Sequence, residues 1–153
     1  MSPLSGVESL TGADYIYDGD GTMVKSIING VSTYYPGRHY NLEVNSTTSI
    51  VQKTYAFGSM TIAVRTGGVL KWVLTDHLGS TSITANANGS VNSEIRYSAF
   101  GEVRYSSGTT PTDYQYTNQL NQPDIGLYYY VARFYDPVIA HFVQLICAVI
   151  TNG

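Results

Sequence analysis

The chain has 153 residues, a mass of 16.7 kDa and a formal charge of −3 at pH 7. This length fits a single domain. Charged residues make up 12% of the chain and hydrophobic residues 43%, and this balance excludes a charge-rich disordered protein. Eight Lys and Arg face eleven Asp and Glu, which excludes nucleic-acid binding through phosphate neutralisation. We therefore expect no nucleic-acid partner.

Glycines and turn dipeptides divide the chain into short β-type segments. Most gaps between successive glycines are 7 to 12 residues, the spacing of turns that join short antiparallel strands. Asn29-Gly30 and Asn88-Gly89 are hairpin-turn dipeptides, because both residue types tolerate positive φ. Residues 91–97 alternate between apolar and polar side chains, as a half-buried strand does. The sequence predicts an all-β fold, a curved antiparallel sheet of roughly ten to thirteen short strands.

A weak internal repeat supports this prediction. The sequence Tyr-Ala-Phe-Gly at residues 55–58 recurs as Tyr-Ser-Ala-Phe-Gly at residues 97–101. Repeats of one hairpin unit favour stacking side by side into a longer sheet.

The two ends of the chain differ from the repetitive middle. We predict a flexible lead over residues 1–12, the β domain over residues 13–137 and a divergent tail over residues 138–153. The chain starts without the apolar stretch of a signal peptide, and the longest apolar run, residues 138–150, is too short for a membrane span. We expect a cytoplasmic chain as encoded, with no membrane partner. Whether residues 145–153 are native or a truncation scar stays open.

A glycine-rich acidic loop is the candidate metal site. Asp18 and Asp20 alternate with glycines, and Asp14 precedes them closely. Carboxylate oxygens are ligands that Ca²⁺ prefers, so Ca²⁺ is the candidate cofactor. The loop lacks the later ligands of an EF-hand. The alternative is a turn in which an Asp side chain binds its own backbone.

Asp76 and His77 are the candidate acid–base pair. Neighbours on a strand point to opposite faces, so these side chains meet only if a turn brings them together. Ser80 follows closely, but the chain has no Gly-x-Ser-x-Gly nucleophile elbow. The single cysteine, Cys147, excludes an internal disulfide and fits a buried, inert thiol.

Four segments resemble the RHS/YD-repeat family and its repeat-associated core domain. The first, residues 15–35, is similar to a YD repeat that begins Tyr-Ile-Tyr-Asp-Gly. The second is the Asp-His-Leu-Gly-Ser-Thr box at residues 76–81, and the third is the Tyr-to-Gly element at residues 97–101. The fourth, residues 126–137, resembles the closing signature of the family. The resemblance extends from about residue 13 to residue 144.

This resemblance implies a strip of β-hairpins. In the family such strips coil into a hollow shell around a C-terminal toxin segment, and the parent proteins are usually bacterial and secreted or on the cell surface. Several members also cut themselves after the closing signature by chemistry likened to an aspartic protease.

Arg133 and Asp136 match the start of that cleavage region, where the family continues with Gly-Arg-Phe and a second Asp. Here Ala140-His141-Phe142 replaces the first element, and residues 145–147 stand where the second Asp would fall. A single carboxylate cannot share a proton with a missing partner, so we expect the paired-acid mechanism to be disabled.

Two functions remain under consideration. The first is a structural or interaction fragment of an RHS-type shell, without autoproteolytic or toxin activity. Its unpaired end strands would join another chain, so the expected partner is a second copy. The alternative is a Ca²⁺-dependent hydrolase of a small ester or lactone, in which Asp18 and Asp20 hold the metal and His77 or Asp76 activates water.

Overall fold

The computed structural model describes residues 13–131 and 133–143, and the all-β prediction is confirmed in this part of the chain. One 3-10 turn, η1 (Tyr116–Asn118), interrupts the strands. The strands are β1 (Ala13–Tyr17), β2 (Met23–Ile28), β3 (Val31–Gly37), β4 (Tyr40–Val44), β5 (Ser49–Phe57), β6 (Met60–Thr66), β7 (Val69–Thr75), β8 (Thr81–Asn86), β9 (Val91–Tyr97), β10 (Val103–Gly108), β11 (Leu120–Gln122), β12 (Leu127–Tyr130), β13 (Arg133–Asp136) and β14 (His141–Val143).

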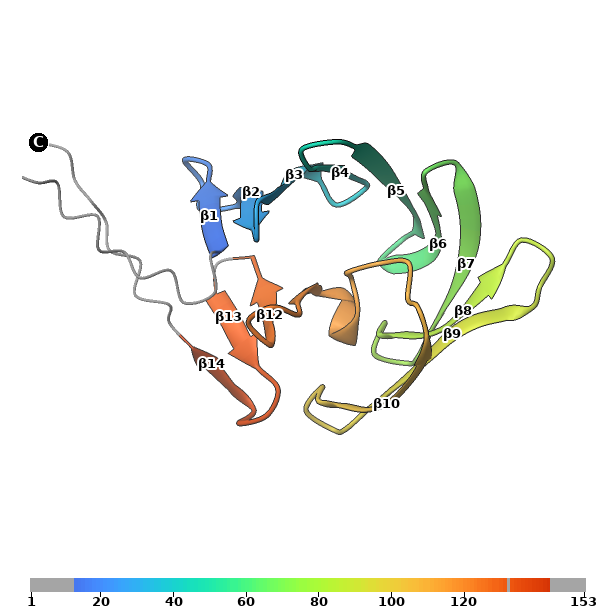
Figure 1. Cartoon of the computed structure of the whole chain (residues 1–153). Coiled ribbons are helices and arrows are strands. Elements are labelled where there is room, and N and C mark those ends of the chain that lie inside the picture. The colour runs from blue at the N-terminus through green and yellow to red at the C-terminus, as the bar shows by residue number, and fades with distance from the viewer. Residues whose placement is uncertain (1–12, 132, 144–153) are drawn as a thin grey trace, which may run out of the picture.

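The strands form two antiparallel sheets with simple connections. Strands β1 to β10 form a ten-stranded sheet in chain order, and β11 to β14 form a four-stranded sheet in the same manner. The large sheet bends into an arc, and the chain after β10 turns back into the hollow of that arc (Figure 1). We call residues 109–131 and 133–136 the returning segment.

Four hairpin turns of the large sheet share one backbone arrangement. In each, the first residue donates its N–H to the carbonyl four residues later at 2.8–2.9 Å and accepts the N–H of a glycine three residues later at 2.9–3.1 Å. Each glycine has a positive φ, as in a type I turn followed by a glycine bulge. The pattern in the sequence is Asp, Asn or Ser followed three residues later by Gly. The four turns are residues 18–22, 76–80, 86–90 and 98–102.

The curvature of the sheet follows from these turns. The strand pairs that they connect, β1–β2, β7–β8, β8–β9 and β9–β10, all carry a register shift next to the turn. A β-bulge bends its strand and increases the local twist. Repeated bulges therefore curve a sheet that would otherwise spread as an open, flatter surface.

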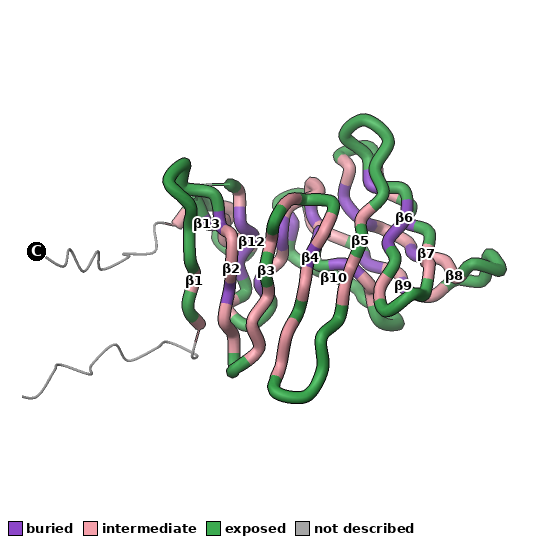
Figure 2. The backbone as a smooth tube through the Cα atoms, turned by 90° about the horizontal axis from the view of Figure 1, so that it is seen from above, coloured by how far each residue is buried: buried purple, intermediate pink, exposed green. Residues whose placement is uncertain are grey.

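The main hydrophobic core lies between the start of the large sheet and the small sheet. Its buried members come from β2, the returning segment and the small sheet: Met23, Tyr114, Leu120, Leu127, Tyr129 and Phe134. The Tyr129 and Phe134 rings are 5.3 Å apart, and Tyr15 of β1 lies 5.6 Å from Phe134. Figure 2 shows buried positions within the strands and exposed positions at the turns. This core holds the small sheet against the start of the large sheet, across the open side of the arc.

The end of the closing signature forms a hairpin. The predicted boundary at residue 137 falls between β13 and β14, and β14 pairs with β13 over Phe134–Val143, Tyr135–Phe142 and Asp136–His141. Ala140 has a φ of 55°, a left-handed conformation that costs roughly 1–2 kcal/mol for a residue with a Cβ. The family pattern places Gly here, which adopts this conformation freely. Residues 1–12 and 144–153, including Cys147, lie outside the described residues.

We expect Gly101→Ala to destabilise the fold much more than Gly89→Ala. The two glycines hold the same place in the same turn, with φ of 94° and 86°. A Cβ at Gly101 would overlap the ring of Tyr116, whereas a Cβ at Gly89 meets nothing within 4 Å. The free energy of unfolding in urea should fall by about 1–2 kcal/mol for Gly89→Ala and by about 1–3 kcal/mol more for Gly101→Ala. Equal losses would show that Tyr116 does not pack against this turn.

Candidate functional site

The candidate site lies along one row of turns of the large sheet. Because neighbouring strands run in opposite directions, the turns that follow odd-numbered strands all lie on the same side of the sheet, at the ends of the strands. We call these turns the rim: residues 18–22, 38–39, 58–59, 76–80 and 98–102. Three of the four segments that carry the family resemblance contribute turns to the rim, and the fourth, residues 126–137, packs against it from inside.

Tyrosine hydroxyls of the returning segment bind backbone carbonyls of the rim. A tyrosine side chain suits this role because its ring fills apolar space while its hydroxyl still donates a hydrogen bond. The four bonds are Tyr116 to Ala99 at 2.9 Å, Tyr135 to Phe100 at 2.8 Å, Tyr128 to Gly101 at 3.4 Å and Tyr129 to Gly21 at 3.3 Å. These bonds connect the first and last turns of the rim to the segment inside the arc.

The turn η1 holds the middle of the rim. Arg38 donates a hydrogen bond to the carbonyl of Asn118 at 2.5 Å, and the Asn118 amide donates to the carbonyl of Ser59 at 3.4 Å. The backbone N–H of Thr117 donates to the hydroxyl of Ser80, which is fully buried, at 2.9 Å. All five rim turns are therefore bound by the returning segment.

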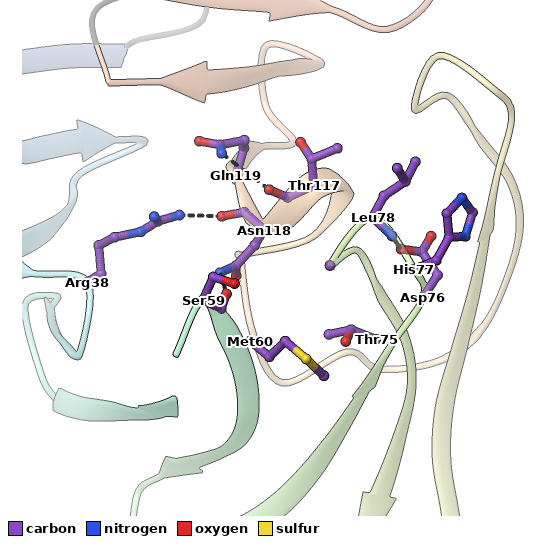
Figure 3. A pocket seen from close by; sticks show the side chains of 11 residues that line it. Arg38, Ser59, Met60, Thr75, Asp76, His77, Leu78, Thr117, Asn118 and Gln119 are labelled. Carbon is purple, nitrogen blue, oxygen red and sulfur yellow. Dashed lines mark hydrogen bonds between the residues drawn. The ribbon is translucent and has the colours of Figure 1, made fainter. Parts of the chain in front are cut away.

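An open cleft of about 640 Å³ lies between η1 and the rim turns. Its lining includes Arg38, Met60, His77, Leu78 and Asn118. Arg38 and His77 lie on opposite sides of the cleft, and the Arg38 guanidinium reaches to Asn118 (Figure 3). The cleft is open to solvent and is lined by both polar and apolar residues of the rim and η1.

The Asp76 carboxylate accepts hydrogen bonds within its own turn. Its Oδ1 accepts the N–H groups of Leu78 and Ser80, both at 2.9 Å. His77 is exposed, and in the described part of the chain no hydrogen bond joins it to Asp76 or Ser80. The structure therefore brings Asp76 and Ser80 together as parts of a turn and does not align the three side chains as an acid–base relay.

Asp18 has the same role in the first rim turn. Its Oδ1 accepts the N–H groups of Asp20 at 3.0 Å and Thr22 at 2.9 Å. Within residues 13–131 and 133–143, no three or more His, Cys, Asp or Glu side chains form a group that could hold a metal ion, so Asp14, Asp18 and Asp20 do not converge. The turns of Asp18 and Asp76 are six strands apart in the sheet, which is roughly 30 Å along its surface.

Arg133 and Asp136 do not pair with each other. Asp136 Oδ1 accepts the N–H groups of Val138 at 2.8 Å and Ile139 at 3.4 Å, so this carboxylate also closes a turn. The Arg133 guanidinium lies 4.3 Å from the centre of the Phe142 ring. The residues predicted to stand where the family has a second Asp lie outside the described residues.

Sequence reasoning did not single out the residues that build this site. Asn118 is of a residue type that tolerates the positive φ it adopts, whereas positive φ at Thr117 is unexpected for a β-branched residue. Arg38 stands in an ordinary turn sequence. Tyrosine is frequent, with 14 residues in the chain, but frequency alone does not say which hydroxyls bind the rim. Their partners lie 17 to 108 residues away, a separation that no local pattern reveals.

Tyr116→Phe should lower the free energy of unfolding by about 1–2 kcal/mol, because the carbonyl of Ala99 loses its donor in a partly buried place. Tyr55→Phe is the matched control, since Tyr55 is 41% exposed on β5, and it should change stability by less than about 0.5 kcal/mol. Urea denaturation followed by circular dichroism measures both values. A Tyr116→Phe protein as stable as the control would contradict the role of the hydroxyl.

Comparisons with known proteins agree with this geometry. A model of the family described as Teneurin YD-shell matches residues 36–149. Salivary gland surface protein 1 of Aedes aegypti is 37% identical over 76 residues, which cover 48% of this chain and 2% of that protein.

The fold also occurs in solved toxin structures. The crystal structure of TcdB2-TccC3 matches with a TM-score of 0.71 and 20% identity over 85% of this chain. The structure of the Photorhabdus luminescens Tc holotoxin pore, with a mutation in TccC3, matches with a TM-score of 0.72 and 20% identity over 92% of this chain. The chain spans 8% of each of those chains. The predicted resemblance to RHS/YD-repeat proteins is confirmed. Among the described residues, no helix is both long and apolar enough to cross a membrane.

Proposed function

The chain belongs to the Teneurin YD-shell family. We propose that it is a segment of shell wall whose curvature is held by its own returning segment and that it has no enzymatic activity. A structural, shell-like β domain follows from the family and the fold. The proposal that the chain holds its own curvature is supported by the binding of all five rim turns by the returning segment. Because that segment occupies the hollow, the wall keeps its curvature without a further chain inside it.

The partner that we propose is a second copy of the chain. Within residues 13–131 and 133–143, β1 pairs only with β2 and β10 only with β9, so the outer side of β10 can take another strand, and we propose that it takes β1 of a second copy. Since the number of strands is even, β10 of one copy runs antiparallel to β1 of the next, as the meander requires. Asp14 on β1 and Arg104 on β10 are exposed and opposite in charge, which favours this pairing over β10 with β10.

Light scattering during size-exclusion chromatography tests the assembly. We expect a mass above 16.7 kDa that rises with protein concentration. Val103→Lys places a charge on the free edge strand β10, where Val103 is 44% exposed, and should weaken association at least tenfold. Val69→Lys is the control, because Val69 is 59% exposed on the central strand β7. A monomer at all concentrations, or equal weakening by both variants, would rule out pairing through this edge.

We further propose that the chain does not cleave itself. Support comes from Asp136, whose Oδ1 is engaged by two N–H groups of its own turn, and from Arg133, which stacks on Phe142 instead of facing Asp136. An intact-mass spectrum of the purified protein should keep the full-length mass for days between pH 4 and pH 8. A fragment that ends shortly after residue 136, and that disappears in an Asp136→Asn variant, would contradict the proposal.

A further inference from the structure

Two facing amide side chains line the hollow of the arc. Asn41 of β4 and Gln52 of β5 are direct partners in the register, so their Cβ atoms lie about 5 Å apart on one face. The Gln52 Nε2 donates to the carbonyl of Pro111 in the returning segment at 2.6 Å. Since the returning segment lies inside the arc (Figure 1), the Gln52 side chain and its neighbour Asn41 face the hollow.

These amides have unused hydrogen-bonding atoms. Asn41 is 5% exposed, and neither its Oδ1 nor its Nδ2 has a partner in the described chain. The Oε1 of Gln52 is also buried and without a partner there. Leaving a buried polar atom unpaired costs about 1–3 kcal/mol, so these atoms call for a partner such as a water molecule or an ion.

Two carboxylates adjoin the amides. Glu43 lies two residues after Asn41 and therefore on the same face of β4. Asp113 lies two residues after Pro111, whose carbonyl is already bound to Gln52. The negative charge of Glu43 acts on Asp113, and Glu43 is exposed to solvent. Asp113 still reaches solvent, so an ion could enter from this side.

We propose that Asn41, Glu43, Gln52 and Asp113 form a binding site for a divalent cation, Ca²⁺ in the first place. Two carboxylates and two amide oxygens are hard oxygen ligands of the kind that Ca²⁺ binds, with water completing the coordination on the solvent side. Mg²⁺ demands a tighter octahedral geometry and fits a pair of neighbouring strands less well. The cation would offset the repulsion between the carboxylates and bind the returning segment to β4 and β5.

This site is separate from the acidic loop of Asp18 and Asp20. That loop lies on the rim, and the Asp18 carboxylate already accepts two N–H groups there. In the hollow, by contrast, the amide oxygens are free of other partners. The two places can be distinguished by removing the same number of charges from each.

Terbium luminescence, excited through tyrosine, tests the proposal on the whole chain. Tb³⁺ replaces Ca²⁺ at oxygen sites, and the electrostatic influence of Asp113 on Tyr35 and Tyr114 places two possible sensitisers nearby. We expect saturable binding of one ion, competed by Ca²⁺ at lower concentration than by Mg²⁺. The double variant Glu43→Gln/Asp113→Asn should weaken binding at least a hundredfold, while Asp18→Asn/Asp20→Asn should leave it within about twofold.

A third variant separates binding from folding. Asn41→Leu keeps a similar shape and removes the unpaired amide, so the metal-free protein should melt at the same or a higher temperature while the rise in melting temperature caused by Ca²⁺ is lost. The proposal is overturned if wild-type protein shows no saturable Tb³⁺ signal, or if Mg²⁺ competes as well as Ca²⁺. It is also overturned if the Asp18/Asp20 variant loses binding as much as the variant in the hollow.

Discussion

Hydrogen bonds from the returning segment to rim carbonyls are the interaction on which the architecture depends. A sheet that bends through bulged turns has backbone groups in those turns that neighbouring strands cannot pair. In this chain, tyrosine hydroxyls and the Asn118 amide of η1 donate to several of these carbonyls from inside the arc. The same side chains fill the space under the turns, as the Tyr97, Tyr116 and Tyr128 rings show with centroid distances of 5.6 and 5.9 Å. Curvature and core packing are thus produced by the same residues.

The local part of this structure could be predicted from the sequence. The Asp-x-x-Gly and Ser-x-x-Gly patterns at residues 18–21, 76–79 and 98–101 specify turns whose first side chain accepts an N–H group four residues later. Glycine spacing predicted short strands and a curved sheet, and both are present. The division into two sheets, with the chain between them inside the arc, could not be predicted. It depends on contacts such as Gln52 with Pro111, which are 59 residues apart.

The candidate catalytic residues show why chemical residue types alone mislead. Asp18 and Asp76 attracted a functional interpretation because carboxylates beside glycine or histidine can bind metals or move protons, and Asp136 because it matches the start of the family's cleavage region. In the structure each of them accepts two backbone N–H groups of its own turn. Asp at the start of a turn is favoured for this local bond regardless of any activity. The sequence alone cannot distinguish the two roles, because both require the same residue at the same position.

The distribution of charge inside the arc separates structural groups from candidate functional ones. Burial raises the pKa of the Tyr97 and Tyr128 hydroxyls further above their ordinary value, so these groups stay neutral at physiological pH and serve as donors. Asp113 and Glu43 differ, because both are carboxylates at exposed positions and the negative charge of Glu43 acts on Asp113. Two like charges near each other repel, so these carboxylates do not stabilise the wall as the neutral hydroxyls do. Their presence, next to unpaired amides, is the feature of the hollow that packing does not explain.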